Sequence, residues 1–351
     1  MKMRTPKIIP EESLSSWMIR ISLLNACDMW TLSWKVWEKG RLLTSDFERN
    51  LPAERIHQLS EASGRPYAEI DALLLIHSVR QHTVVLNTAG KIWPWMIPIG
   101  ICYRNRSIGQ PFCPQCFQEG TPHLRRGWRM AWATACNKHR ILLQDCCPEC
   151  GFLYSPTKLT GFEGSMVFCH HCGHDMRKNS AKPAFSAIQS AIEKNKLCCF
   201  GQKCDMSTWL LTLDNAVCLI RRATLAPTGY ISTMLHDLGL LRLPESPKTG
   251  GTFEWLPIWE RHALLEAAAC MISQRMSNLI QSAQKNRVTK STLLNTLHRD
   301  RSPVFVELYN HLPVSERASG SKTKHNCPQS EQAVMKKWAR LERKIQRVIA
   351  S

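Results

Sequence analysis

Two cysteine-rich clusters, together spanning 60 residues, constrain the fold of this chain more than any other feature. Each cluster joins two closely spaced ligand pairs across 18 or 19 intervening residues. Two ligands on one tight turn can occupy adjacent corners of a tetrahedron, and a second turn supplies the other two. The spacing therefore predicts two four-ligand zinc sites. The ligands are Cys113, Cys116, Cys136 and His139 in the first site, and Cys147, Cys150, Cys169 and Cys172 in the second.

The number of protein ligands bears on the role of these sites. A catalytic zinc keeps one coordination position open for water or substrate, whereas a structural zinc is fully ligated by the protein. We therefore expect two structural zinc ions. A redox Cys-x2-Cys pair or an iron–sulfur centre is the alternative. In the second site His170, His171 or His174 could replace a cysteine, although four cysteines are the simpler set.

The chain contains 16 cysteines, and whether they are thiols or disulfides depends on the cellular compartment. Its first residues show no apolar core of signal-peptide length, and no apolar run approaches the ~20 residues that a membrane span requires. We expect a soluble protein of the bacterial cytoplasm with no membrane partner. Thiols stay reduced there and serve as metal ligands or as small buried groups. The segment "CCFGQKC" (198–204) hints at a third metal site but lacks a partner pair.

The chain is strongly basic, with a formal net charge of +18, and the charge is unevenly distributed. Residues 104–140 hold seven Lys or Arg residues against one acid, and residues 285–351 hold fourteen against five. Such a field favours nucleic acid, an anionic membrane surface or acidic proteins as partners. A solvated basic face that only aids solubility is the plainer interpretation. The density of charge around a cysteine cluster favours nucleic acid or a ribonucleoprotein.

Part of this charge lies between the ligands of the first cluster, in "RRGWRMAWA" (125–133). The sequence predicts a short helix in which Trp128 and Trp132, four residues apart, share a face and pack the core of the zinc module. Three arginines would then point outward and contact nucleic acid or a protein partner. These candidates are Arg125, Arg126 and Arg129.

Helical patterns dominate on both sides of the clusters. Near the N-terminus an apolar stripe at helical spacing contains Leu14, Trp17, Met18, Ile21 and Leu24, with Ser13 as the cap. Residues 51–77 predict two helices with a break at Gly64, either a helix-turn-helix or an ordinary helical hairpin. The second helix is too acidic and apolar to read bases, so a use in protein contact fits better.

Toward the C-terminus, residues 260–284 predict one long amphipathic helix, and residues 334–348 predict a final basic one. The expected fold class is therefore mainly α. We expect a helical N-terminal domain (1–105), a central module with two zinc knuckle or ribbon sites (106–180) and a helical C-terminal domain (181–351).

Common catalytic signatures are absent from the sequence. It contains no G-x4-G-K-[ST] loop for phosphates, no His-Glu-x2-His stretch and no nucleophile elbow. The 28 acidic residues form no cluster of the kind that two-metal nucleases use, although scattered acids can converge in space. We therefore expect no enzymatic activity.

The segment "FCPQC…HLRRGWRMAWATACNKHRILLQDCCPECG", together with the upstream "SLSSWMIR" (13–20), resembles the TniQ family, whose members choose targets for transposons. Members pair a "CPxC…WR…CxxH" knuckle with a following "CPxCG" knuckle after a helical N-terminus. The resemblance covers residues 8–175. It departs from the family pattern at Asn137, where members usually have proline.

The resemblance implies a non-catalytic adaptor with two structural Zn2+ ions. Some family members dock, as homodimers, on a CRISPR guide-RNA effector ribonucleoprotein at target DNA and recruit an AAA+ transposition regulator, which brings the transposase. Others bind a transposon attachment site on DNA directly and sequence-specifically. The length of this chain is closer to that of the CRISPR-coupled members. We therefore expect the first role and keep the second as the alternative.

Overall fold

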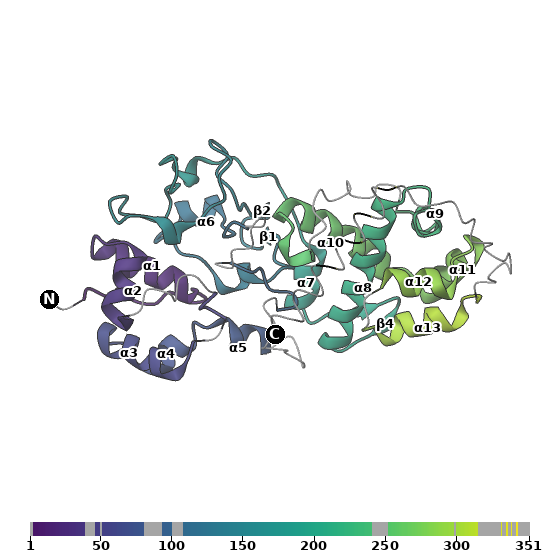
Figure 1. Cartoon of the computed structure of the whole chain (residues 1–351), viewed down its shortest axis with the longest axis horizontal. Coiled ribbons are helices and arrows are strands. Elements are labelled where there is room, and N and C mark those ends of the chain that lie inside the picture. Colours follow the sequence, from purple (N-terminus) through teal and green to yellow (C-terminus); the bar gives the residue numbers. More distant parts are fainter. Residues whose placement is uncertain are drawn as a thin grey trace. The chain divides into compact units, whose positions relative to one another are not determined.

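The computed structural model describes residues 3–38, 46–49, 51–80, 93–99, 108–240, 252–297 and 300–314, with Glu331, Met335, Trp338 and Glu342 beyond them. The described part is mainly helical, which confirms the expected fold class (Figure 1). Two small antiparallel hairpins supplement the helices: β1 (Ala135–Cys136) pairs with β2 (Ile141–Leu142), and β3 (Cys198–Cys199) pairs with β4 (Gln202–Lys203). None of the described helices combines the length and the apolar character needed to cross a lipid bilayer.

The N-terminal helices are α1 (Leu14–Leu24), α2 (Met29–Trp37), α3 (Ala53–Ser63), α4 (Tyr67–Asp71) and α5 (Leu75–Arg80). Ser13 caps α1 as predicted, because its side chain accepts a hydrogen bond from the Ser16 amide. The predicted stripe of α1 is buried except for Leu24, which is about half exposed at the last turn. The predicted break between α3 and α4 lies at Gly64, whose φ of +68° suits glycine.

The C-terminal half of the described chain contains α7 (Ala187–Glu193), α8 (Met206–Leu225), α9 (Tyr230–Asp237), α10 (Ile258–Ile272), α11 (Met276–Lys285), α12 (Lys290–Thr296) and α13 (Pro303–His311). The single long helix expected over residues 260–284 is wrong, because α10 ends at Ile272 and α11 begins at Met276. The carbonyl of Ile272 instead accepts a hydrogen bond from the Phe200 amide, 2.6 Å away, in the β3–β4 hairpin. A tertiary contact thus replaces the helical hydrogen bond that would continue α10.

The chain divides into a compact unit, Met1–Val314, and a second unit, Ser315–Ser351. The first unit contains the first two predicted domains and the third as far as Val314, and the boundaries at residues 105 and 180 stay predictions. Most of the final helix expected over residues 334–348 lies outside the described residues. Of that segment Trp338 is described, and its side chain is exposed.

The interior of the first unit continues from the central module into the C-terminal helices. A buried guanidinium makes this connection: Arg261 of α10 donates to the carbonyl of Ala131 at 2.7 Å and to that of Leu256 at 3.0 Å. Burial lowers the pKa of Arg261 to about 10, and the nearby Asp145 opposes this shift. Helix α10, which follows in the sequence, therefore fixes the segment between the two ligand pairs of the first cluster.

Candidate metal centres

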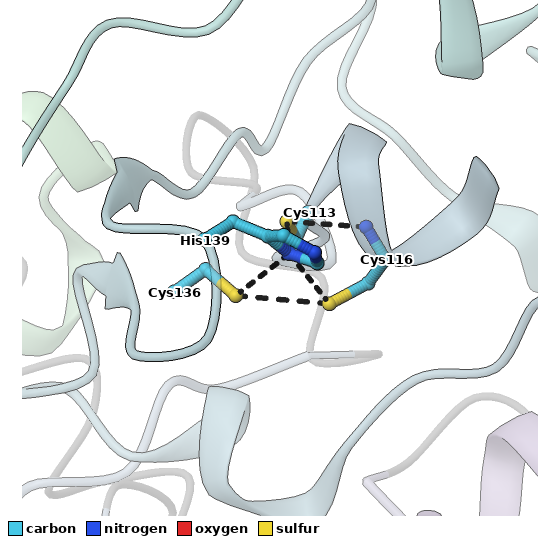
Figure 2. A group of neighbouring side chains, drawn as sticks. All are labelled: Cys113, Cys116, Cys136 and His139. Carbon is cyan, nitrogen blue, oxygen red and sulfur yellow. Dashed lines mark hydrogen bonds between the residues drawn. The ribbon is translucent and has the colours of Figure 1, made fainter. Parts of the chain in front are cut away.

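The first ligand group is assembled by one short helix and one hairpin. Cys113 is the N-cap of α6 (Pro114–Gln118), and its sulfur accepts a hydrogen bond from the Cys116 amide at 3.4 Å. Pro114 occupies the first helical position, where its fixed φ and missing amide are tolerated. Cys136 ends β1, and His139 lies in the turn before β2. The two knuckles face each other, and the four side chains converge (Figure 2).

The ligand atoms lie at distances that suit a tetrahedral zinc ion. Zn–S bonds of about 2.3 Å and Zn–N bonds of about 2.0 Å give tetrahedral edges of about 3.8 Å between sulfurs and about 3.6 Å between sulfur and nitrogen. The sulfurs of Cys116 and Cys136 are 3.6 Å apart. His139 Nδ1 lies 3.4, 3.3 and 3.5 Å from the sulfurs of Cys113, Cys116 and Cys136. This group could hold a metal ion through three sulfurs and Nδ1.

The other ring nitrogen of His139 faces a carboxylate. His139 Nε2 lies 3.1 Å from Oε1 of Glu119, and Lys138 contacts the same carboxylate. Metal-bound histidines commonly donate their second N–H to a carboxylate, which fixes the tautomer and the ring orientation. The Glu119 carboxylate lies on the Nε2 side of the ring, while Nδ1 faces the three sulfurs.

The three thiols of the first group hydrogen-bond to one another, and this moves their pKa values apart. Hydrogen bonds with Cys113 and Cys116 hold the pKa of Cys136 far below its usual value. The hydrogen bond with Cys116 raises the pKa of Cys113. A divalent cation would favour the thiolate form of all three cysteines, because thiolates are the form that binds metal.

The second group consists of four cysteines on two facing knuckles. The sulfurs of Cys147 and Cys172 are 3.7 Å apart, and those of Cys150 and Cys169 are 3.8 Å apart. Both distances equal the sulfur–sulfur edge of about 3.8 Å expected around zinc. This group could also hold a metal ion, and it is less buried than the first because Cys172 is exposed.

The three histidines near the second group have other contacts. His171 stacks on Phe152 with ring centroids 3.6 Å apart, and His174 Nε2 lies 2.8 Å from Oδ1 of Asn179. His170 is outside the four-atom group as well. The geometry therefore favours the all-cysteine set. Within the described residues, no metal-binding group forms at 198–204 either, where the cysteines lie on the β3–β4 hairpin.

The tryptophans between the first knuckles pack inward as predicted, but the local structure differs. Trp128 and Trp132 are both buried. The short helix predicted over residues 125–133 is a 3-10 helix of four residues (Arg126–Arg129), followed by extended chain. After the helix the backbone pairs with residues 95–97, because the Ile97 amide donates to the carbonyl of Arg129 and the Ala131 amide donates to that of Trp95.

The outward orientation expected for Arg129 is wrong. Its side chain is fully buried and forms ion pairs with Asp46, at 2.6 Å, and with Glu48. It also donates to the carbonyl of Ile97 at 2.8 Å. Burial raises the pKa of Asp46 to about 6, and the Arg129 charge opposes that shift. Arg129 therefore connects the first metal group to the N-terminal segment.

The other two arginines remain at the surface. Arg125 is partly exposed, 3.3 Å from the Glu11 carboxylate and with its guanidinium 5.8 Å from the centroid of the Trp128 ring. Arg126 is half-buried and donates to the carbonyl of Ala72. Both line a hollow of about 510 Å3 beside the first metal group, together with Glu193. The contact of these arginines with nucleic acid or a partner stays a prediction.

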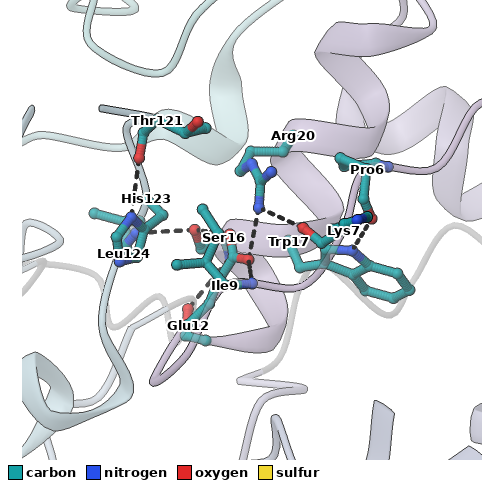
Figure 3. Close-up of polar contacts among 11 residues, drawn as sticks. Pro6, Lys7, Ile9, Glu12, Ser16, Trp17, Arg20, Thr121, His123 and Leu124 are labelled. Atoms are coloured by element: carbon teal, nitrogen blue, oxygen red, sulfur yellow. Dashed lines mark hydrogen bonds and ion pairs between the residues drawn. The ribbon is translucent and has the colours of Figure 1, made fainter. Parts of the chain in front are cut away.

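The "SLSSWMIR" motif is a structural clamp between α1 and the metal module (Figure 3). The hydroxyl of Ser16 donates to the buried carboxylate of Glu12 at 2.8 Å and accepts from the Leu124 amide at 2.9 Å. Arg20 pairs with the same carboxylate at 2.7 Å. In return, the Ser13 amide donates to the carbonyl of Leu124 at 2.9 Å. The motif therefore fixes α1 on the segment between the two knuckles of the first group.

Asn137 is accommodated without disturbing the knuckle. Its side chain is exposed, and Oδ1 accepts a hydrogen bond from Gln189 Nε2 at 3.1 Å.

The sequence patterns did not identify Asp46 and Glu48 as partners of Arg129. Two acids two residues apart carry no signal of their own, and only the fold brings them to Arg129.

Fold and sites together define a helical protein with two closed cysteine-rich groups that hold neighbouring segments in place. Residues 3–143 match the model of the TniQ family. This match confirms, for residues 3–143, the resemblance to the TniQ family seen in the sequence. The matched segment includes the Ser13–Arg20 motif and all four ligands of the first group. Comparison with curated proteins gives no match.

Proposed function

We propose that this protein is a non-catalytic target-selection adaptor of a transposon. It bridges a CRISPR guide-RNA effector complex on target DNA to the AAA+ regulator, and the regulator brings the transposase. The observation that carries this proposal is the TniQ domain over residues 3–143, with a complete ligand group inside it. Both ligand groups are coordinatively closed, and closed groups are suited to holding surfaces in shape.

The metal in both groups is proposed to be Zn2+. Three sulfurs and an imidazole, or four sulfurs, in tetrahedral arrangement are the donor sets that zinc takes in structural sites. The ion would crosslink knuckles that are far apart in the sequence. Cys113, Cys116, Cys136 and His139 would hold one ion, and Cys147, Cys150, Cys169 and Cys172 the other.

The proposed partners follow from charge and exposure. Arg125 and Arg126 line the hollow beside the first metal group. Arginine recognises phosphates and carboxylates through paired hydrogen bonds, so this hollow suits RNA phosphates of an effector complex or acidic side chains of a protein. A homodimer bound to the effector complex, in the cytoplasm, completes the proposal.

Direct sequence-specific binding of an attachment site is the second candidate. One observation favours it: the C-terminal helices α11 and α12 are joined by a tight turn and expose polar side chains. An adaptor recruited by a guide RNA needs no such reading surface.

Co-purification with the guide-RNA effector proteins encoded beside the gene tests the first candidate. The proposal predicts co-elution of the chain with the effector complex in gel filtration at moderate salt. The Arg125→Ala variant should reduce co-elution. The control is Lys194→Ala, which removes one positive charge from an exposed side chain and should leave co-elution unchanged. Separate elution of the wild-type chain would contradict the adaptor role and favour direct DNA binding.

A further inference from the structure

Segments that are far apart in the sequence line the hollow of about 510 Å3 beside the first metal group. The stretch 125–137 contributes most of the lining, α5 contributes Ser78, and α7 contributes Ile192. The lining also includes Cys136 and Asn137 of the second knuckle, so the metal group holds one wall of the hollow in shape. Ligand pockets in proteins commonly have volumes of about 300–1,000 Å3, and this hollow falls within that range.

Part of the lining is apolar and aromatic. It includes Trp128, Met130 and Trp132, whose side chains are almost completely buried. The ring of Trp132 packs against that of Trp95, with centroids 5.9 Å apart, so its position is fixed from behind. A large apolar side chain that enters the hollow can exchange its contact with water for contact with these rings, which is favourable.

The polar part of the lining contains two guanidinium groups, each of which is held by a contact of its own. Arg125 is partly exposed and pairs with Glu11 at 3.3 Å. Arg126 is half-buried and donates to the carbonyl of Ala72. Burial disfavours the charged form of Arg126 and lowers its pKa, and the Glu11 charge opposes this shift. A further anion beside Arg126 would also stabilise its charge, so the hollow favours a ligand that carries a negative group.

Two carboxylates limit how much negative charge the hollow accepts. Glu11 offsets one of the two guanidinium charges, and Glu193 of α7 also belongs to the lining, where it accepts a hydrogen bond from the Asn137 side chain. A nucleic-acid strand carries one negative charge per nucleotide, so its successive phosphates would be repelled by these carboxylates. A peptide can place one carboxylate beside the arginines and neutral N–H groups beside Glu193. The charges of the lining therefore favour a peptide over a nucleic-acid strand.

Gly127 leaves space open at the hollow. It is exposed and belongs to the lining, and an added Cβ would meet no atom of the described residues within 4 Å. Gly127 lies inside the 3-10 helix Arg126–Arg129, a conformation that residues with side chains adopt without strain. The backbone therefore does not require glycine here. Its effect is to keep the hollow free of a side chain between the two arginines and the tryptophans.

We propose that this hollow is a peptide-binding site. It takes one acidic side chain of a protein partner against Arg125 and Arg126, and a neighbouring large apolar side chain against the buried tryptophans. Fixed guanidinium groups bind a carboxylate with directional, charge-assisted hydrogen bonds, and the apolar side chain adds burial. The inference rests on the proposed adaptor role and deepens it, because it assigns this site to a protein segment of the partner assembly and not to its RNA.

The test uses the full chain and a displayed library of short random peptides. Peptides that the wild-type chain retains are sequenced, synthesised with a fluorescent label and titrated by fluorescence anisotropy. We expect them to share an Asp or Glu beside a Leu, Phe or Trp. Replacement of that acid by its amide should weaken binding by about tenfold, the size of one charge-assisted hydrogen bond.

Variants of the chain locate the bound peptide. Gly127→Phe should fill the hollow and weaken binding by about tenfold or more, since a blocked pocket loses both the carboxylate and the apolar contact. The matched control is Gly127→Ala, which adds only a methyl group at the same position and should bind as the wild type does. Arg125→Ala should weaken binding by about tenfold, whereas Lys194→Ala, at an exposed lysine outside the lining, should not.

Three results would overturn the proposal. One is a wild-type chain that retains no peptide, or only peptides without a shared acidic residue. Another is a Gly127→Phe variant that binds the retained peptides as the wild type does. The third is a labelled single-stranded RNA of mixed sequence that binds the wild type but not Gly127→Phe, which would make the hollow a nucleic-acid site. Because peptides are titrated against the chain alone, failure of this test and failure of co-elution with an effector complex are separate results.

Discussion

The two ligand groups have nearly the same spacing in sequence but different surroundings in the fold. The first lies where three segments meet: α1 contacts it through Leu124, the Asp46–Glu48 segment through Arg129, and α10 through Ala131. The second projects further toward solvent, with Cys172 exposed and Phe162, in its intervening loop, 97% exposed. The first group therefore organises the fold, whereas the second stabilises a local loop.

The loop of the second group is nevertheless attached at two points. Gly161 approaches the backbone of Cys27 so closely that an added Cβ would lie 2.8 Å from the Cys27 nitrogen, and its φ is +98°. Tyr154 is buried beside Phe112, with ring centroids 4.6 Å apart. Neither contact involves the knuckles themselves, so the contrast between the groups predicts a graded series of effects.

The largest effect is expected for Cys116→Ser. A structural zinc contributes on the order of 10 kcal/mol, which is comparable to the whole free energy of unfolding of a typical domain. Loss of this buried ligand should therefore unfold the TniQ domain and release one metal ion. Circular dichroism and metal analysis measure both changes. A soluble, folded variant that retains both ions would contradict the ligand assignment.

The next effect is expected for Arg129→Met. Removal of the buried guanidinium leaves Asp46 and Glu48 without their partner, and breaking a buried ion pair costs about 3–5 kcal/mol of the free energy of unfolding. Urea denaturation measures this loss. The matched control is Arg125→Met, whose exposed pair with Glu11 should contribute less than about 1 kcal/mol. Equal losses in the two variants would show that Arg129 does not connect the segments.

A smaller effect is expected for Cys172→Ser. The exposed ligand belongs to the peripheral group, so the variant should lose the second metal ion while the free energy of unfolding falls by about 2 kcal/mol or less. Thermal unfolding combined with metal analysis tests this expectation. Complete unfolding, as expected for Cys116→Ser, would abolish the distinction between the groups.

The smallest effect is expected for Glu119→Gln. The carboxylate orients the ring of His139, and loss of such a contact typically weakens metal affinity by about tenfold. Competition with a chelator measures the affinity of the first group. An unchanged affinity would show that the knuckle itself orients the imidazole.

The sequence predicted the ligand groups, the mainly α fold, the α1 cap and the break at Gly64 because each depends on local spacing. It did not predict contacts that depend on the tertiary structure. Arg129 follows a basic pattern typical of a surface, yet two acids some 80 residues away in the chain draw it inward. Residues 273–275 contain neither glycine nor proline, so the break after Ile272 has no local signal.

The two helix pairs show the same limit. The pair α3–α4 has glycine at its turn and was recognised, whereas α11–α12 has Arg287 in the left-handed position, where glycine is usual. Without a glycine at this position, the turn had no local signal in the sequence. The spacing of Ala283, Val288 and Leu293 was the signal that could have indicated it.

Stepwise removal of metal from the purified chain tests the central claim most directly. A chelator is added gradually while a zinc indicator reports released metal and tryptophan fluorescence reports the surroundings of the 12 tryptophans, Trp128 and Trp132 among them. We predict two zinc ions per chain, released in two steps, with the fluorescence change and loss of helix confined to the second step. A chain purified without zinc, or release of both ions in one step with immediate unfolding, would contradict the division into an organising group and a local one.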